Sequence, residues 1–291
     1  MMDKHNSANK GAVVITGTSS GIGRAAALHL DRMGFKVFAG VRKKEDGESL
    51  RRESTDSLTP LIIDITNNDS ISKASEIVAE SVREAGLNGL VNNAGIPCGG
   101  PVEFVSVDDI WKMMHVNMIG HIVVIQTFLP LLRRAGGRII NIGSIGGILP
   151  LAFNGPYSAS KAALKTITDA LRLELRPSGI QVSMVIPGNV RTAIWEKAGG
   201  GRTERAEHFP PELFEYYGQI LAKFMPFVEK MRITGMAPER VAQVIYKVLT
   251  SKRPGSCYLV GSDAKLQALM ARFLPDGIRD RIMLRYMGIL S

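Results

Sequence analysis

Short apolar runs alternate with longer amphipathic stretches along most of the 291-residue chain. Apolar runs bounded by polar and turn-forming residues predict strands at 12–16, 36–41, 61–63, 89–91, 138–142, 180–186 and 257–260. Apolar positions three and four residues apart predict helices at 22–33, 68–85, 106–134, 157–176 and from 238 onward. Strands that alternate with helices form parallel sheets covered on both faces. The pattern therefore predicts an α/β fold, with one doubly wound parallel sheet in a single domain.

The segments outside this alternation of strands and helices indicate where the domain begins and ends and where it carries an insertion. Residues 1–10 are polar and are expected to form a flexible tail ahead of a domain at 11–262. They lack the apolar core of a secretory leader, and no apolar run reaches the roughly 18–20 residues that span a membrane. Within the domain, residues 193–235 are longer than a connector needs and predict a lid. Residues 263–291 predict a C-terminal helical extension.

Composition and charge narrow the function classes. Hydrophobic residues make up 45% of the chain, which is ordinary for a soluble protein with a packed core. The formal net charge is +9, but the basic residues are scattered and form no stripe interleaved with aromatic residues, so no nucleic-acid partner is expected. Two distant cysteines, Cys98 and Cys257, fit a reducing, cytoplasmic location better than a disulfide framework.

A glycine-rich turn, TGTSSGIG at 16–23, separates the first predicted strand from the first predicted helix. Glycines in such a turn permit positive φ and a close approach of the backbone to a ligand. The N-terminus of the following helix offers N–H groups and the positive end of a dipole, which suit a pyrophosphate. The spacing is G-x-x-x-G-x-G, and its place after the first strand favours a dinucleotide site in a Rossmann-type sheet over a turn without a ligand.

Tyr157 and Lys161, in the sequence YSASK, lie four residues apart and share one face of a predicted helix. A free phenol has a pKa of about 10. A neighbouring ammonium group favours the phenolate and is expected to lower that pKa. A tyrosine tuned in this way can exchange a proton with a substrate oxygen near neutral pH. Ser144 follows the predicted strand 138–142, so its hydroxyl is expected at the sheet edge where such folds bind ligands.

Taken together, these motifs resemble the short-chain dehydrogenase/reductase family. They are TGTSSGIG, Asn92-Asn93-Ala94-Gly95, Ser144, YSASK and Pro187-Gly188, in the family's order and spacing over residues 11–192. Ser144 lies 13 residues before Tyr157, as the family pattern requires. Within the family, the chain looks most like the retinol dehydrogenase and 17-beta-hydroxysteroid dehydrogenase members. The resemblance implies interconversion of an alcohol and a carbonyl group with a nicotinamide dinucleotide.

The resemblance also assigns roles to individual residues. Tyr157 is expected to be the acid/base, Ser144 to orient the reacting oxygen, and Lys161 to contact the nicotinamide ribose. Asn117 is expected to hold a water molecule in a proton relay past Lys161. No metal site is expected. The residues expected to bind the cofactor are Gly17, Ser19, Ser20, Gly21, Ile22, Gly23, Arg42, Asp64, Ile65, Asn93, Ala94, Gly95, Tyr157, Lys161, Pro187, Gly188, Val190 and Thr192.

The residues after the second predicted strand bear on the choice of cofactor. An acidic residue there would hold the adenine ribose and repel a 2′-phosphate. Val41 stands in its place and Arg42 follows. A guanidinium group holds a phosphate bidentately, so NADP(H) is favoured. NAD(H) stays open because residues 42–44 could form only a solvated turn, and because residues 18–20 lack the basic residue that NADP-preferring members often carry.

The predicted lid is too apolar for a disordered loop. In the family this insertion covers the substrate, so its composition predicts a small lipophilic substrate such as a steroid, a retinoid or a long-chain carbonyl compound. The alternative is that its apolar residues pack on the domain or on an oligomer partner. These residues are Trp195, Phe209, Leu213, Phe214, Tyr216, Tyr217, Phe224, Met225 and Phe227.

The C-terminal extension carries apolar residues at helical spacing over 265–274, followed by a second amphipathic piece that Asp276 is expected to cap. An apolar stripe usually packs in a core or an interface, and this interpretation is favoured. A basic amphipathic helix can instead make peripheral contact with an anionic membrane. By resemblance, a homodimer or homotetramer is expected through the helices at 106–134 and 157–176.

The sequence as a whole predicts an NADP(H)-dependent oxidoreductase that interconverts an alcohol and a carbonyl group, with Tyr157 as acid/base. One alternative is an NAD(H)-dependent dehydrogenase of a smaller hydroxyacid or acyl-thioester ketone. The other is a non-catalytic dinucleotide-binding protein. The presence of Ser144, Tyr157, Lys161 and Asn117 together argues against the second alternative, because a protein that only binds need not keep all four.

Overall fold

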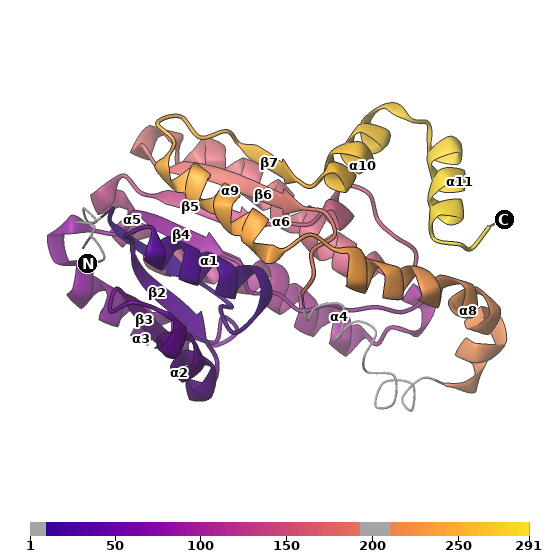
Figure 1. Ribbon diagram of the computed structural model, residues 1–291, viewed down its shortest axis with the longest axis horizontal. Coiled ribbons are helices and arrows are strands. Elements are labelled where there is room, and N and C mark those ends of the chain that lie inside the picture. The colour runs from indigo at the N-terminus through magenta and orange to yellow at the C-terminus, as the bar shows by residue number, and fades with distance from the viewer. Residues whose placement is uncertain (1–9, 193–209, 291) are drawn as a thin grey trace, which may run out of the picture.

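The computed structural model of the protein describes residues 10–192 and 210–290. Its sheet has seven parallel strands in the order β3-β2-β1-β4-β5-β6-β7 (Figure 1). The chain winds outward from β1 to β3, returns to β4 beside β1, and winds outward again, which is the doubly wound arrangement that the sequence predicts. The strands are β1 Ala12–Ile15, β2 Lys36–Val41, β3 Leu58–Ile62, β4 Gly89–Asn92, β5 Arg138–Ile142, β6 Gln181–Pro187 and β7 Cys257–Val260.

Helices cover both faces of this sheet (Figure 1). The alternating side chains of β1 show the two cores: Val13 and Ile15 pack with α1 and α9, whereas Ala12 and Val14 pack with α3 and α5. The predicted fold class is therefore confirmed. The helices are α1 Gly21–Arg32, α2 Lys44–Glu53, α3 Asn68–Val82, α4 Val107–Met114, α5 Gly120–Ala135, α6 Gly155–Glu174, α8 Pro211–Thr234, α9 Pro238–Thr250, α10 Ser262–Phe273 and α11 Asp276–Tyr286.

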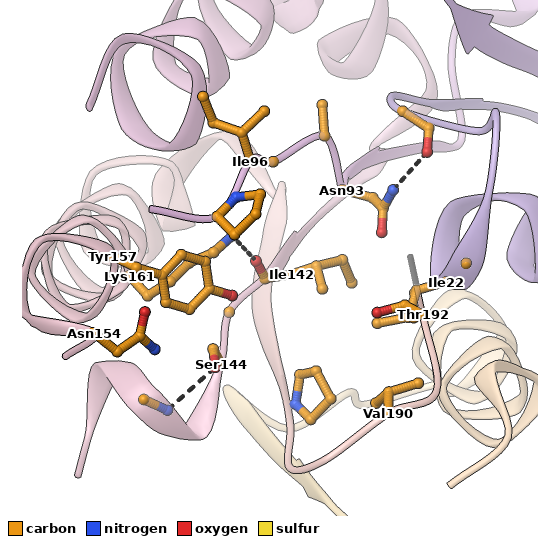
Figure 2. Close-up of a pocket in the computed structure, with 18 of the residues that line it drawn as sticks. Ile22, Asn93, Ile96, Ile142, Ser144, Asn154, Tyr157, Lys161, Val190 and Thr192 are labelled. Carbon is orange, nitrogen blue, oxygen red and sulfur yellow. Dashed lines mark hydrogen bonds between the residues drawn. The ribbon is translucent and has the colours of Figure 1, made fainter. Parts of the chain in front are cut away.

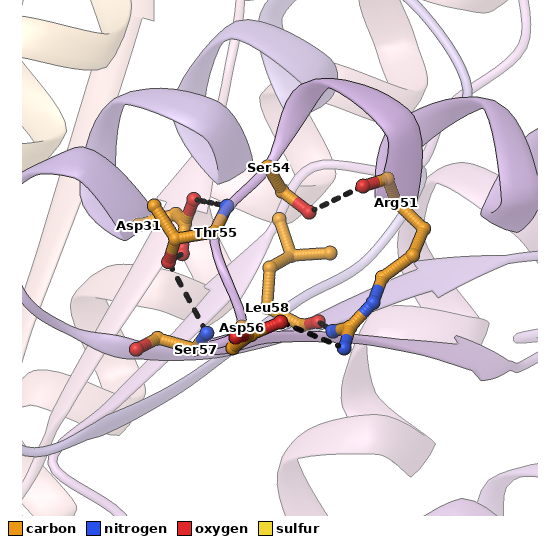
Figure 3. Close-up of polar contacts among 7 residues, drawn as sticks. All are labelled: Asp31, Arg51, Ser54, Thr55, Asp56, Ser57 and Leu58. Carbon is orange, nitrogen blue, oxygen red and sulfur yellow. Dashed lines mark hydrogen bonds and ion pairs between the residues drawn. The ribbon is translucent and has the colours of Figure 1, made fainter.

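Helix α2 and the first half of β3 are not predicted by the sequence. Only two of the ten residues of α2 are buried, so its apolar pattern is too sparse to recognise. Polar contacts fix the chain here instead (Figure 3). The Asp31 carboxylate accepts hydrogen bonds from the backbone N–H of Thr55 at 2.7 Å and from its hydroxyl at 2.6 Å. Arg51 donates to the carbonyl of Leu58, where β3 begins, and these contacts place β3 against β2.

The long helix predicted at 106–134 consists of α4, a π-helical segment at His115–Ile119, and α5 in unbroken succession. Ser106 caps it, as predicted, by accepting a hydrogen bond from the backbone N–H of Asp109 at 3.1 Å. By length and composition alone, residues 107–135 form the one helix of the described residues that could cross a membrane. Phe128 and its apolar neighbours in α5 pack against the sheet, so we interpret this helix as a core helix.

The predicted lid and tail segments are placed only in part. Residues 1–9, and residues 193–209 with Trp195 and Phe209, lie outside the described part of the chain. The rest of the lid is α8, and α10 and α11 follow β7 as the expected C-terminal helices. In Figure 1 these three helices extend beyond the end of the sheet toward which the strand arrows point. They share an apolar cluster that includes Phe224, Phe227, Met231, Met283 and Met287.

Candidate active site

A cleft of about 570 Å³ lies at the carboxyl ends of the strands and continues to α8, α10 and α11 (Figure 2). Every predicted site residue lines this cleft except Gly23 and Asn117. The fold therefore brings together segments that are up to 175 positions apart in the chain, from Gly17 to Thr192. The predicted residues that line it are Gly17, Ser19, Ser20, Gly21, Ile22, Arg42, Asp64, Ile65, Asn93, Ala94, Gly95, Ser144, Tyr157, Lys161, Pro187, Gly188, Val190 and Thr192.

Tyr157 lies in the first turn of α6 and points into the cleft near Ser144 (Figure 2). Burial raises the pKa of Tyr157, and a hydrogen bond with the Ser144 hydroxyl offsets this only in part. The pKa of the phenol therefore lies above its ordinary value. This corrects the expectation that the pKa of Tyr157 would be lowered by the neighbouring ammonium group, because here the cost of moving the phenolate out of water dominates.

Lys161 lies one turn further along α6, with its Nζ atom 5.9 Å from the centre of the Tyr157 ring. The spacing of four residues thus brings the two side chains together, as predicted. Nζ donates a hydrogen bond to the carbonyl of Ile142, the last residue of β5, at 3.1 Å (Figure 2). Burial lowers the pKa of Lys161 to about 8. The ammonium is therefore anchored to the sheet beside the phenol.

Asn117 is fully buried in the π-helical segment and does not line the cleft. Its side-chain oxygen accepts a hydrogen bond from the backbone N–H of Ile96 at 2.9 Å. Its side-chain nitrogen donates to the Ile96 carbonyl at 3.0 Å and to the Ser160 hydroxyl at 3.1 Å. Both amide protons are thereby used, and one lone pair of the oxygen remains. Asn117 holds the segment after Gly95 against α6, and its role in a water relay stays a prediction.

The glycine turn after β1 is packed closely against the loop after β4. Gly17 has a φ of +69°, and a Cβ atom there would lie 2.7 Å from the Cα atom of Ala94. The side-chain nitrogen of Asn93 donates to the carbonyls of Thr16 and Gly17 at 3.0 and 2.9 Å. Ser20, the N-cap of α1, makes no side-chain capping bond to the first turn. The turn thus leaves backbone room and a helix N-terminus at the cleft, which fits a pyrophosphate.

Two residues lie where the sequence predicts contacts to the adenosine half of a dinucleotide. Arg42 follows β2 and lines the cleft, as does Val41, the last residue of β2, although its side chain is buried. The Asp64 side chain accepts hydrogen bonds from the backbone N–H and the hydroxyl of Thr66, at 2.9 and 2.7 Å. Partial burial raises the pKa of Asp64, but these bonds and the nearby charges of Arg42 and His115 outweigh it, so the pKa is lowered overall. Asp64 is therefore an anion that accepts hydrogen bonds.

His121 is a fully buried polar residue next to the site that the sequence reasoning missed. Its Nε2 atom lies 2.7 Å from the carbonyl oxygen of Ala94. Burial and, to a smaller extent, the charge of Lys161 lower the pKa of His121 to about 3. The imidazole is therefore neutral at physiological pH, and its N–H donates to Ala94. No motif marks this position, because its contact exists only after α5 packs beside the loop after β4.

Asn189 and Asp263 form a second feature that the sequence reasoning missed. Both line the cleft. The Asp263 carboxylate, in the first turn of α10, accepts a hydrogen bond from the backbone N–H of Asn189 at 2.6 Å. The Asn189 side chain donates to the carbonyl of Met231 in α8 at 2.7 Å. The segment after β6, which carries the predicted nicotinamide contacts, is thereby tied to α8 and α10, two of the three helices at the far end of the cleft.

Comparison with known proteins agrees with this geometry. The sequence profile of the family described as short chain dehydrogenase matches residues 11–202. The chain belongs to the short-chain dehydrogenase family. It is therefore an oxidoreductase that acts on CH–OH groups with a nicotinamide dinucleotide.

Three relatives in this family illustrate its range. The chain is 36% identical to retinol dehydrogenase 5 of Homo sapiens over 282 residues, which cover 95% of this chain and 88% of that protein. It is 37% identical to 17-beta-hydroxysteroid dehydrogenase type 6 of Bos taurus over 281 residues, covering 94% and 87%. It is 32% identical to an NADPH-dependent 3-dehydrocapnine reductase of Ornithobacterium rhinotracheale over 274 residues, covering 92% and 94%. The predicted likeness to retinol and 17-beta-hydroxysteroid dehydrogenases is confirmed.

The fold is also that of short-chain dehydrogenases of known structure. A short chain dehydrogenase from Burkholderia cenocepacia J2315 in complex with NADP superposes with a TM-score of 0.72 at 25% identity, covering 94% of this chain and 97% of that one. That enzyme was crystallised with NADP, and the present chain offers a glycine turn and a cleft of the same fold. A nicotinamide dinucleotide is therefore the cofactor class of this site.

Proposed function

We propose that the protein is an NADP(H)-dependent oxidoreductase that interconverts an alcohol and a carbonyl group on a lipophilic substrate, with Tyr157 as acid/base. The observation that carries the proposal is the meeting of Tyr157, Ser144 and Lys161 in one cleft that also contains the glycine turn after β1. A nicotinamide dinucleotide supplies or accepts the hydride when it is bound there. The protein has to bind this dinucleotide, orient the substrate and donate or accept one proton.

Each residue of the site has a task that its surroundings support. Tyr157 is buried with a raised pKa, so it is a phenol at neutral pH and donates the proton that a carbonyl oxygen needs on reduction. Ser144 shares a hydrogen bond with Tyr157 and positions the same substrate oxygen. Lys161, anchored on Ile142, lies beside the phenol, where it contacts the nicotinamide ribose and resupplies the proton. Asn117 supports a water molecule behind Lys161 through its remaining lone pair.

The remaining predicted residues bind the dinucleotide. The turn 17–22 and the N-terminus of α1 take the pyrophosphate, and Asp64 with Ile65 takes the adenine. The loop at Asn93–Gly95 forms one wall of the adenosine site. The segment from Pro187 to Thr192 contacts the nicotinamide carboxamide. Gly23 contributes indirectly, because it allows α1 to approach the turn closely enough for this arrangement.

A substrate panel tests the proposed function directly. Purified protein is mixed with steroid, retinoid, long-chain and small polar alcohols and carbonyl compounds, and cofactor absorbance is followed with NADPH, NADP, NADH and NAD. Turnover of lipophilic compounds with NADP(H) supports the proposal. Turnover restricted to small hydroxyacids or acyl-thioester ketones would overturn the lipophilic assignment, and dinucleotide binding without any turnover would favour a binding protein.

The cofactor preference rests on Arg42, which lines the cleft directly after β2, and on the absence of a carboxylate at Val41. The reductase from Ornithobacterium rhinotracheale, which is described as NADPH-dependent, supports this preference. We expect Arg42→Asp to swing the ratio of affinities from NADP(H) toward NAD(H) by about tenfold or more, because a charged hydrogen bond worth roughly 1.5–3 kcal/mol is replaced by repulsion. Isothermal titration with both cofactors measures the ratio.

Lys43→Asp provides the matched control for Arg42→Asp. It makes the same change of charge one position further along, at an exposed residue that does not line the cleft. The ratio of NADP(H) to NAD(H) affinity should change less than about threefold, since exposed charges act only weakly. Equal swings in both variants would mean that general electrostatics sets the preference, and that Arg42 makes no specific contact.

The substrate end of the cleft is apolar, which supports a lipophilic substrate. Helix α8 contributes Phe224, Phe227, Val228 and Met231 to its lining. Met225, which the sequence grouped with the two phenylalanines, does not line it. The aromatic rings of Phe224 and Phe227 are 5.5 Å apart. These side chains belong both to the cleft wall and to the apolar cluster of the C-terminal helices, a position that is compatible with substrate contact and with packing on the domain.

We expect Phe227→Ala to raise the KM for a bulky lipophilic carbonyl compound by roughly 10- to 100-fold, at about 1–3 kcal/mol per lost apolar contact. Met287→Ala is the control, because Met287 is buried in the same cluster but does not line the cleft. Both variants should lower the melting temperature through the cavity that they leave. A selective rise in KM for Phe227→Ala supports the lipophilic site, whereas equal effects of the two variants on KM would contradict it.

The proposal extends to self-association. Trp111 of α4 and Leu173 of α6 are 65% and 63% exposed, and both lie on helices that the family resemblance implicates in assembly. We propose a homodimer or homotetramer through these helices. Size-exclusion chromatography with light scattering measures the mass, and a monomer at micromolar concentration would overturn this part without affecting the assignment of the chemistry.

A further inference from the structure

Helix α10 carries large apolar side chains on its outer surface. Leu266, Leu269 and Phe273 are 60%, 57% and 66% exposed. They are spaced i, i+3 and i+7, so they lie on one face of the helix. Only Ala264 of this helix is buried. The helix thus resembles an amphipathic helix whose apolar face is turned away from the core.

Helix α11 repeats the pattern. Ile278, Ile282 and Tyr286 are 54%, 42% and 45% exposed and follow each other at intervals of four residues. The inner side of α11 packs through Met283, and Met287 just after its end also packs into the cluster with α8. The packing of α11 on the protein is therefore made by its inner side, and Ile278, Ile282 and Tyr286 stay exposed. We call Leu266, Leu269, Phe273, Ile278, Ile282 and Tyr286 the C-terminal apolar face.

The charges around this face are mainly basic. Residues 262–290 contain five basic residues and three acidic ones. The acidic groups are engaged within the protein: Asp276 and Asp280 pair with Arg279, at 2.8 and 3.8 Å, and Asp263 accepts the bond from Asn189. The exposed basic residues beside the apolar side chains are Lys265, Arg272, Arg281 and Arg285.

The same two helices also close the cleft. Gln267 of α10 and Tyr286 of α11 line it. The ring of Tyr286 lies 5.1 Å from the ring of Phe227 on α8, and its hydroxyl lies 3.8 Å from the sulfur of Met231. Tyr286 is thus shared between the C-terminal apolar face and the apolar end of the cleft. In Figure 1, α10 and α11 project from the body of the protein at this end.

We propose that α10 and α11 dock the protein on the surface of an anionic lipid bilayer. The C-terminal apolar face enters the boundary between headgroups and acyl chains, and the basic residues contact the acidic headgroups. Because Tyr286 also borders the cleft, docking presents the apolar end of the cleft to the membrane, from which a lipophilic substrate enters. The last step rests on the proposed function, whereas docking itself does not.

A second copy of the chain is the less favourable occupant of this face. An isologous dimer places the same surface on both subunits. Arginines that flank the apolar residues on one copy would then lie near arginines on the other, and like charges at an interface are unfavourable. An anionic bilayer offers both an apolar layer and the complementary charge, over a surface that needs no matching shape.

Sedimentation with vesicles tests the docking. The full chain is mixed with vesicles of phosphatidylcholine alone or of phosphatidylcholine with 30% phosphatidylglycerol, as a probe composition. We expect binding to the anionic vesicles at least tenfold tighter than to the neutral ones, and weaker binding as salt is raised. For Leu269→Ser/Phe273→Ser, we expect binding to anionic vesicles to fall at least tenfold. Neither residue lines the cleft, so turnover of a small water-soluble substrate should stay unchanged.

Ile62→Ser/Ile77→Ser is the matched control, since these side chains are 54% and 51% exposed on β3 and α3, far from α10 in the sequence. It should bind vesicles like the wild type. If the double variant in α10 fails to fold, as judged by circular dichroism, Arg272→Glu/Arg281→Glu takes its place and should lose only the preference for anionic vesicles.

Three results would overturn the proposal: no binding of the wild type to anionic vesicles, equal losses in the α10 variant and the control, or dissociation of a soluble dimer by the α10 variant without any vesicle binding. The last result would assign the face to contacts between copies. Failure of the proposed function is distinguishable, because it would leave vesicle binding intact while no lipophilic substrate is turned over.

Discussion

Tyr157→Phe should lower kcat by about 10²–10⁴-fold while leaving cofactor affinity nearly unchanged, because the ring remains and only the proton-transfer group is removed. The substitution should leave the local structure of α6 undisturbed. The backbone carbonyl of Tyr157 still accepts from Ser160 at 2.7 Å, and the helix N-terminus needs no phenol. Single-turnover rates measured with saturating NADPH isolate the chemical step from substrate binding.

The pH dependence of the wild type should have a definite sign. In the proposed mechanism, reduction requires Tyr157 as a neutral phenol, and burial raises its pKa. The rate of reduction is therefore expected to be full at neutral pH and to fall as pH rises toward that pKa. Lys161, with a pKa of about 8, loses its charge at a lower pH than Tyr157, so its titration accounts for an earlier and separate step of the fall. Ser144→Ala removes the hydrogen bond that lowers the pKa of Tyr157. Only the later step, at the pKa of Tyr157, should therefore move to higher pH in that variant.

Tyr286→Phe is the control for Tyr157→Phe. It removes a hydroxyl from another tyrosine that lines the cleft, and that hydroxyl contacts the sulfur of Met231 at 3.8 Å. We expect kcat to change less than about threefold, since a weak contact to sulfur contributes little. Near wild-type turnover in Tyr157→Phe, with an active substrate, would mean that another group transfers the proton.

The strands and the site motifs could be predicted because each is marked by a short, continuous stretch of sequence. The run KVFAGV coincides with β2, and CYLV with β7. Such strands are largely apolar because helices cover both faces of the sheet. The start of β3 was missed because Thr59 and Pro60 break its apolar run. Proline is tolerated there because β3 is an edge strand that pairs only with β2.

The residues of the candidate site could be predicted from motifs. The contacts that hold these residues in place could not. His121 meets Ala94, and Asp263 meets Asn189, across 27 and 74 residues of sequence. No local sequence pattern indicates which residues will meet across such separations. The pKa of Tyr157 was also predicted with the wrong sign, because the spacing to Lys161 is local information whereas burial depends on the whole fold. Electrostatic arguments from sequence therefore identify the interacting groups more reliably than the net shift.

The second prediction with a large expected effect concerns Gly23, whose importance also depends on contacts that form only in the folded protein. This glycine does not line the cleft, yet a Cβ atom there would lie 2.2 Å from the carbonyl oxygen of Gly17 and 2.4 Å from the side-chain nitrogen of Asn93. That nitrogen donates to the carbonyls of Thr16 and Gly17. An added methyl group must therefore displace either the glycine turn or the side chain that holds it.

Gly23→Ala should weaken NADPH binding by roughly 5- to 150-fold and lower the melting temperature, because overpacking of a tightly packed site costs about 1–3 kcal/mol. The expected loss falls on cofactor binding because the displaced turn is the one proposed to receive the pyrophosphate. Isothermal titration with NADPH and thermal unfolding of the same samples measure both effects. Retained affinity within twofold would show that the turn relaxes without changing its ligand-binding backbone.

Gly218→Ala separates this local effect from a general intolerance of added methyl groups. Gly218 lies inside α8, where the nearest atom to a new Cβ is the Cβ of Phe214 at 4.0 Å. Alanine is better than glycine inside a helix by about 1 kcal/mol, so this variant should melt at an equal or higher temperature and bind NADPH normally. If Gly218→Ala also loses cofactor affinity, the defect in Gly23→Ala cannot be assigned to the glycine turn. Normal binding in Gly218→Ala beside impaired binding in Gly23→Ala would locate the pyrophosphate at the N-terminus of α1.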